Sequence, residues 1–175
     1  MKKSLTKLDY ELIQHAKDCI DKNYDGMEYR HTVGAAVRCK NGKIYTGINC
    51  DGIHGACAEI ITIGSALSAG ERDMECIVGV YGKDKGNKVI PPCGNCRQML
   101  YDYFPDITVL IADEGNKVIK VSITDLLLYV YMKNYLNPKT VVGVDYAMKT
   151  VAFCKRNFQI PGLIFVTGDA ESLPF

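Results

Sequence analysis

Three cysteines and one glutamate, in two separated stretches, are the residues whose types and spacing could do chemistry. Cys57-Ala58-Glu59 forms the first stretch, and Pro92-Cys93-Gly94-Asn95-Cys96 forms the second. Proline is common at the beginning of helices, so the second stretch predicts a helix start that places both of its thiols on one face. The free N–H groups at that end favour the thiolate, which is the form that binds metals. A Cys-x-x-Cys pair alone would fit a redox site equally well.

Cys57 supplies a third sulfur, and Glu59 a carboxylate beside it. Positions i and i+2 point apart inside a helix, so both side chains reach one point only if Cys57 begins the helix, which Gly55 and Ala56 before it permit. Three thiolates suit zinc and leave a fourth coordination position for water, whose pKa zinc lowers from about 16 toward about 7. Glu59 could then carry protons as an acid–base group.

One alternative to a catalytic site remains open, a closed structural zinc site. Cys50 or His54 could supply a fourth ligand and close the site, because structural zinc sites have four protein ligands. The chain would then be a structural zinc-binding module, and Glu59 would have no chemical role.

The two stretches resemble the three-cysteine zinc form of the cytidine deaminase family, and especially its blasticidin S deaminase-like branch. Three further segments carry the same resemblance: Val33-Gly34-Ala35-Ala36, Tyr45-Thr46-Gly47-Ile48-Asn49 and Arg97-Gln98. The likeness extends from about Leu8 to about Leu128. It implies a three-layer α/β/α fold with a five-stranded mixed sheet. It also implies Zn²⁺ bound by the three cysteines, catalysis by Glu59, and a homotetramer.

The same resemblance implies a reaction and a set of substrate contacts. The reaction is hydrolytic deamination at C4 of a cytosine nucleoside, with cytidine or deoxycytidine expected first and blasticidin S or a related cytosine compound as the alternative. Asn49 and Asp51 match residues that bind the sugar 3′-hydroxyl, although both types are also common in turns. Ala58 matches a residue whose carbonyl contacts the departing amino group, and His31 matches an aromatic residue that packs on the substrate, although a lone histidine is more often structural.

Periodicity and turn residues predict alternating helices and short strands. The expected helices are 6–22, 57–69, 93–103 and 124–136, and the expected strands are 32–38, 43–48, 75–81, 107–112 and 117–121. Only the turn Asp113-Glu114-Gly115-Asn116 separates the last two strands, so we expect them to be antiparallel neighbours. By resemblance, such a hairpin is typical of deaminases of free nucleosides rather than those of tRNA and single-stranded nucleic acid.

Composition favours a globular domain with a small-molecule substrate. The chain has 175 residues and a formal net charge of +1, which gives no electrostatic reason to expect nucleic acid or an acidic membrane as a partner. No apolar run approaches the roughly 18 residues of a membrane span. Eight cysteines without a secretory signal are expected to be reduced, so we expect a cytoplasmic protein.

The C-terminal residues resemble a different family. Val141–Asp145 and Phe165–Phe175 resemble part of an S-adenosylmethionine methyltransferase, in which Asp145 and Asp169 match the residues that contact the ribose and the adenine. The strand and glycine-rich loop that would precede them are missing here, and so few elements could not bury a core. We therefore expect a deaminase domain over 1–136 and an incomplete, non-functional methyltransferase fragment over 137–175.

Overall fold

The computed structural model describes residues 4–28, 30–53, 55–82, 87–113, 115–127, 138–145 and 147–168. The chain divides into two compact units, Met1–Thr124 and Asp125–Phe175. Each unit is considered by itself, and the predicted boundary between residues 136 and 137 stays a prediction.

A mixed sheet forms the centre of the first unit. Its strands follow the order β2-β1-β3-β5-β6, with a short β4 paired to β3. The β3–β5 pair is parallel and the other pairs are antiparallel. The strands are β1 (Val33–Cys39), β2 (Ile44–Ile48), β3 (Met74–Tyr81), β4 (Lys88–Ile90), β5 (Thr108–Ala112) and β6 (Val118–Ser122).

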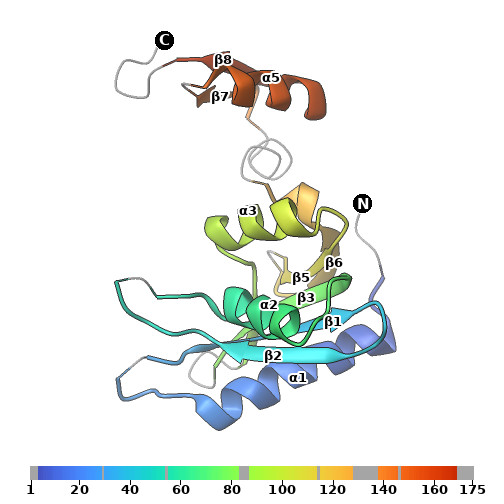
Figure 1. The fold of residues 1–175 in the computed structure, drawn as a ribbon, viewed down its shortest axis with the longest axis vertical. Coiled ribbons are helices and arrows are strands. Elements are labelled where there is room, and N and C mark those ends of the chain that lie inside the picture. The colour runs from blue at the N-terminus through green and yellow to red at the C-terminus, as the bar shows by residue number, and fades with distance from the viewer. Residues whose placement is uncertain are drawn as a thin grey trace. The chain divides into compact units, whose positions relative to one another are not determined.

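Helices cover both faces of this sheet. Figure 1 shows α1 (Lys7–Asn23) on one face, and α2 (Ala58–Ser68) and α3 (Gly94–Tyr103) on the other. The apolar face of α1 packs on the strands because its buried residues recur at helical spacing: Leu12, Ile13, Ala16 and Ile20. The three-layer α/β/α architecture with a five-stranded mixed path is therefore confirmed.

A buried ionic cluster also lies between α1 and the sheet. Asp9 is fully buried, and its Oδ1 accepts hydrogen bonds from Arg38 Nη2 at 3.0 Å and Lys120 Nζ at 2.9 Å. Its Oδ2 accepts from the backbone N–H and the hydroxyl of Thr6, which closes the first turn of α1. Arg38 in turn binds Glu75 through Nε at 2.9 Å. Every charge in the cluster thus faces an opposite one.

The predicted hairpin over 107–121 is confirmed, since β5 and β6 pair antiparallel with Leu110 opposite Lys120. Strand β4 was missed because it has only three residues and follows a stretch rich in charged and amide side chains. Within the predicted helix 124–136, the structure shows a 3₁₀ helix at Ile123–Leu126, and residues 128–136 lie outside the described part of the chain.

The second unit contains one strand–helix–strand element. Strands β7 (Val141–Asp145) and β8 (Leu163–Thr167) pair in parallel, and α5 (Met148–Asn157) connects them. Phe158 and Phe165 are buried, with ring centroids 6.4 Å apart. Asp169, one of the two predicted cofactor contacts, lies outside the described residues. None of the helices in the described ranges combines the length and the hydropathy that crossing a membrane requires.

Candidate active site

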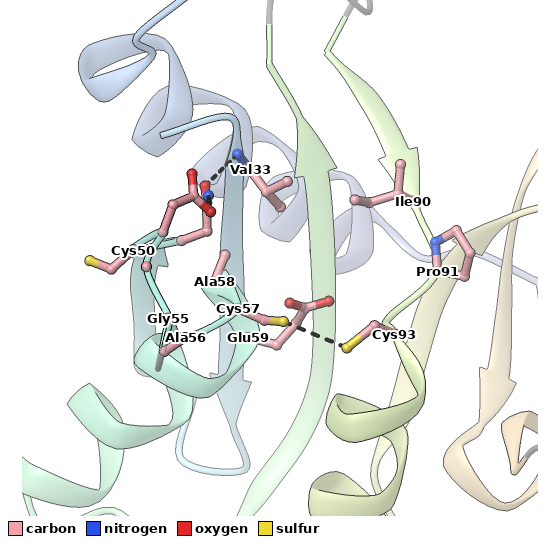
Figure 2. A pocket seen from close by; sticks show the side chains of 13 residues that line it. Val33, Cys50, Gly55, Ala56, Cys57, Ala58, Glu59, Ile90, Pro91 and Cys93 are labelled. Atoms are coloured by element: carbon pink, nitrogen blue, oxygen red, sulfur yellow. Dashed lines mark hydrogen bonds between the residues drawn. The ribbon is translucent and has the colours of Figure 1, made fainter. Parts of the chain in front are cut away.

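Two helix starts bring the three predicted thiols together. Cys57 is the N-cap of α2, Cys93 is the N-cap of α3, and Cys96 lies in the first turn of α3. Their sulfur atoms all lie within 4.8 Å of one another, and Cys57 and Cys93 are 3.5 Å apart (Figure 2). The expectation that Cys57 begins its helix is met, and this is what allows Glu59, two residues on, to face the same site.

The donor set fits a zinc ion. Three sulfurs bound to tetrahedral zinc at about 2.3 Å lie about 3.8 Å from one another, which matches the spacing of this cluster. Burial raises the pKa of Cys96, and the negative charges of Glu59, Cys93 and Cys57 raise it further. Burial also acts on Cys93, but backbone N–H groups at the start of α3 and the neighbouring thiols outweigh it and lower its pKa. Crowded acidic groups of this kind are stabilised by a bound cation.

Glu59 lies directly beside the cluster. Its side chain is 5% exposed, and its Oε2 is 3.7 Å from the Cys96 sulfur. Burial raises its pKa. On the sheet side it faces Gly79 of β3, where a Cβ atom would lie 3.3 Å from Glu59 Oε1. The carboxylate therefore occupies a confined position beside the three thiols that could bind a metal.

A cavity of about 350 Å³ opens onto Glu59 and the sulfurs of Cys57 and Cys93. Val33, Ile90 and Pro91 form apolar walls around it (Figure 2). Asp51 lines the cavity too, and the described lining residues include no lysine or arginine. The cavity can therefore take a flat, largely uncharged ring next to an acid, with hydrogen-bond acceptors around it.

The other predicted contact residues have different surroundings. Asn49 and Ala58 line the cavity, whereas His31 is not among its lining residues. His31 Nδ1 lies 2.9 Å from the carbonyl oxygen of Asn49, and because a carbonyl only accepts, this nitrogen carries the proton. The Ala58 carbonyl accepts from the Thr62 hydroxyl at 2.7 Å. The predicted roles of these residues in substrate binding stay predictions.

Cys50, one of the two candidates for a fourth ligand, does not join the cluster. Its side chain is exposed and points away from the sulfurs of Cys57 and Cys93 (Figure 2). The metal-binding group found among the described residues contains Cys57, Cys93 and Cys96 only. His54, the other candidate, lies outside the described residues.

The fold and the three-thiol cluster define a zinc hydrolase of the deaminase class, and the comparisons with known proteins agree. Residues 6–111 match the family model for the cytidine and deoxycytidylate deaminase zinc-binding region. Blasticidin-S deaminase from Bacillus cereus is 37% identical over 139 residues, which cover 75% of this chain and 97% of that protein. The crystal structure of cytidine deaminase from Burkholderia pseudomallei is similar at 31% identity and a TM-score of 0.57, covering 71% of this chain and 98% of that one. The chain therefore belongs to the cytidine and deoxycytidylate deaminase zinc-binding family, and it is a zinc-dependent hydrolase of cytosine compounds.

A separate, shorter similarity concerns another family. A stretch of 45 residues, 26% of this chain, is 42% identical to phthiotriol/phenolphthiotriol dimycocerosates methyltransferase from Mycobacterium tuberculosis. It spans only 17% of that enzyme. The predicted resemblance to part of a methyltransferase is thus confirmed as a partial match, and it carries no activity over to this chain.

Sequence reasoning missed the residues that shape the cavity around the chemistry. The expected strand 75–81 gives Gly79 no special role, and the sequence does not identify Val33, Ile90 and Pro91 as cavity walls. A glycine inside an otherwise branched apolar strand, Ile77-Val78-Gly79-Val80, was the available signal, because such a glycine often marks a close approach by another group.

Proposed function

We propose that this chain catalyses hydrolytic deamination at C4 of a cytosine nucleoside, with cytidine or deoxycytidine as the first candidates. One observation carries the proposal: the buried carboxylate of Glu59 lines a cavity and lies 3.7 Å from Cys96, one of three converging thiols. A structural zinc site requires no such acid at its side.

In the proposed mechanism, Cys57, Cys93 and Cys96 would hold the zinc ion. When bound, zinc makes a water molecule acidic enough to attack at neutral pH. Glu59 takes a proton from that water and passes it to N3 of the cytosine ring. The oxygen of the water forms a bond with C4. Glu59 then takes the second proton, from the new hydroxyl on C4, and passes it to the amino nitrogen as the C4–N bond breaks and the C4 carbonyl forms. Uridine or deoxyuridine leaves together with ammonia, and Glu59 returns to its original state.

The rest of the cavity orients the nucleoside. The apolar walls formed by Val33 and Ile90 suit the faces of the pyrimidine ring, since they exclude water from the reacting atoms. Asp51 can accept a hydrogen bond from a sugar hydroxyl, because an ionised carboxylate is an acceptor only. A 5′-phosphate would gain no cation from the described lining residues and would face this carboxylate, so the proposed substrate is a nucleoside rather than a nucleotide.

Blasticidin S is the second candidate substrate. It is favoured by the similarity to the Bacillus cereus enzyme named for that compound, which extends over 97% of that protein. The same zinc site and Glu59 would act on its cytosine group. A role in pyrimidine salvage follows from cytidine as substrate and is part of this proposal. The homotetramer and the cytoplasmic location stay predictions, and sedimentation of the purified chain tests the first of them.

Loss of ultraviolet absorbance on cytidine and on blasticidin S, measured side by side with the zinc-loaded chain, tests the proposal. Turnover of cytidine that disappears in Glu59→Gln supports the first candidate, whereas turnover of the antibiotic alone supports the second. If neither compound is turned over, and the wild-type chain and Glu59→Gln bind zinc equally, the site is a structural zinc module.

A further inference from the structure

Thr62 lies one turn after Glu59 on α2, and its polar side chain is fully buried. Its hydroxyl has two acceptors within the protein: the carbonyl oxygen of Ala58 in the same helix at 2.7 Å, and the carbonyl oxygen of Ala35 in β1 at 3.3 Å. A threonine hydroxyl has one donor hydrogen, so the two carbonyls share it. The side chain therefore joins the first turn of α2 to the sheet.

The part of the sheet that faces Thr62 allows a close approach of the helix. Gly47 of β2 and Gly79 of β3 both pair with Ala35, so these three residues form one row across three strands. A Cβ atom on Gly47 would lie 2.8 Å from both the backbone nitrogen and the hydroxyl oxygen of Thr62, which is closer than side chains pack. The backbone of α2 thus lies directly against this row.

Glu59 contacts the same row of residues. Positions i and i+3 lie on one face of a helix, so Glu59 and Thr62 both face the sheet. Thr62 lies over Gly47, and Glu59 lies over Gly79, where a Cβ atom would be 3.3 Å from its Oε1. The distance between α2 and the sheet therefore determines where the Glu59 carboxylate lies in the cavity and how far it is from the Cys96 sulfur, which is now 3.7 Å.

We infer that Thr62 is a positioning residue for the reaction: its hydroxyl fixes the distance of the first turn of α2 from the sheet, and thereby the position of the Glu59 carboxylate. Figure 2 shows Ala58 and Glu59 in this first turn. Thr62 is not among the described residues that line the cavity, so it acts through Glu59 and not on the substrate. This inference rests on the proposed function, because it concerns the acid of that reaction.

Thr62→Val and Thr62→Ser separate the hydroxyl from the size of the side chain. Valine places a methyl group where the hydroxyl lies, and because carbon and oxygen atoms in contact stay about 3.3–3.6 Å apart, the first turn of α2 must move by roughly half an ångström. We expect kcat of the zinc-loaded chain to fall about three- to tenfold, with KM and zinc content near wild type. Serine keeps the hydroxyl, so its kcat should stay within about twofold of wild type. The substrate is whichever of cytidine and blasticidin S the wild-type chain turns over.

Ser65→Ala is the matched control on the same helix. The Ser65 hydroxyl also donates to the carbonyl four residues earlier, that of Ile61 at 3.0 Å, but the side chain is exposed. Its loss should leave kcat unchanged. If kcat in Ser65→Ala fell as far as in Thr62→Val, any lost hydroxyl on α2 would have this effect, and the inference would be overturned.

A double-mutant cycle tests whether Thr62 acts through Glu59. In a chain that already carries Glu59→Gln, the further change Thr62→Val should leave the residual kcat unchanged, because no acid remains to be displaced. An equal fall in both backgrounds would overturn the inference, since Thr62 would then affect the site as a whole. A wild-type kcat in the single variant Thr62→Val would overturn it as well.

A crystal structure of zinc-loaded Thr62→Val needs no turnover. The distance between Glu59 Oε2 and the Cys96 sulfur should differ from that in the wild-type crystal by about 0.5 Å. An unchanged distance would overturn the inference whether or not either compound is turned over, whereas the proposed function fails only if the wild-type chain has no turnover. If valine prevents folding, Thr62→Ala replaces it in all these measurements, because it also lacks the hydroxyl but adds no atom, and the same direction of change is expected.

Discussion

Asp9 on the α1 face of the main sheet and Glu59 on the α2 face are both almost fully buried, yet their surroundings differ completely. Asp9 accepts four hydrogen bonds, two of them from the cations Arg38 and Lys120. Glu59 faces thiols, and its Oε2 lies 3.7 Å from the Cys96 sulfur. Burial acts against the charged form of both acids, but the hydrogen bonds of Asp9 overcome it and lower its pKa to about 2, whereas the pKa of Glu59 is raised.

This difference separates an acid that stabilises the fold from one that is available for chemistry. A carboxylate fixed by two cations and a helix start cannot give up its partners, and its removal would strand their charges. A confined carboxylate with few partners can exchange a proton with a nearby water molecule. Burial of an acid is therefore not in itself a sign of catalysis, and the sign lies in what surrounds it.

The largest effect is expected from Glu59→Gln. Glutamine has nearly the same shape but cannot accept and return a proton, so kcat should fall about 10²- to 10⁴-fold. Zinc content and thermal stability should stay close to wild type, because Glu59 is not a ligand in this account. Loss of zinc in this variant, measured by metal analysis, would contradict that assignment.

Asp9→Asn is the matched change on the opposite face. It leaves Arg38 and Lys120 buried without a full counter-charge, so the free energy of unfolding should fall by about 3–5 kcal/mol. Urea unfolding measures this loss. The kcat per folded molecule should remain near wild type. A fall in kcat as large as that of Glu59→Gln would contradict the assignment of Asp9 to stability and Glu59 to chemistry.

The pH dependence of stability gives a third, smaller effect. The pKa of Asp9 is lowered from 3.8 to about 2 on folding, so its contribution is fully present above about pH 4 and is lost as the pH falls through 2. A shift of this size corresponds to about 2 kcal/mol. Unfolding curves between pH 5 and pH 2 should show that loss in wild type and a correspondingly weaker dependence in Asp9→Asn. Parallel curves for the two proteins would show that Asp9 is not the group responsible.

The smallest effect is expected from Gly79→Ala, which tests whether kcat depends on the position of the Glu59 carboxylate. The added Cβ would lie 3.3 Å from Glu59 Oε1, so the carboxylate must shift by a few tenths of an ångström. We expect kcat to fall by up to about tenfold, as small misplacements of a catalytic group do, while zinc is retained. Gly64→Ala, where a Cβ meets no atom within 4 Å, is the control: it should leave kcat unchanged and stabilise the helix by up to about 1 kcal/mol. Equal kcat values for both variants would show that Glu59 tolerates the added methyl group.

Much of the metal site could be predicted because its rules are local. The i and i+2 spacing of Cys57 and Glu59 allowed only a helix start, and the structure places Cys57 there as an N-cap. The four-residue turn after Ala112 allowed only a hairpin, which β5 and β6 form.

The contacts of Asp9 and Asn49 depend on residues far away in the chain and could not be predicted in the same way. Asp9 meets Lys120, 111 residues later, and no periodicity in a single sequence shows such a pairing. For Asn49, the sequence indicated a substrate contact by resemblance, while the four protein partners of its carboxamide became visible only once β1 and β2 were paired. The pairing of distant polar groups is set by tertiary structure, which local patterns do not contain.

The central claim is that three thiols hold one zinc ion and leave its remaining position to solvent beside Glu59. The X-ray absorption spectrum of the zinc-loaded full chain tests it most directly. We predict three sulfur neighbours at about 2.3 Å and one oxygen at about 2.0 Å. A fourth sulfur, or the scattering pattern of an imidazole from His54, would contradict the account, because a closed metal site could not activate water.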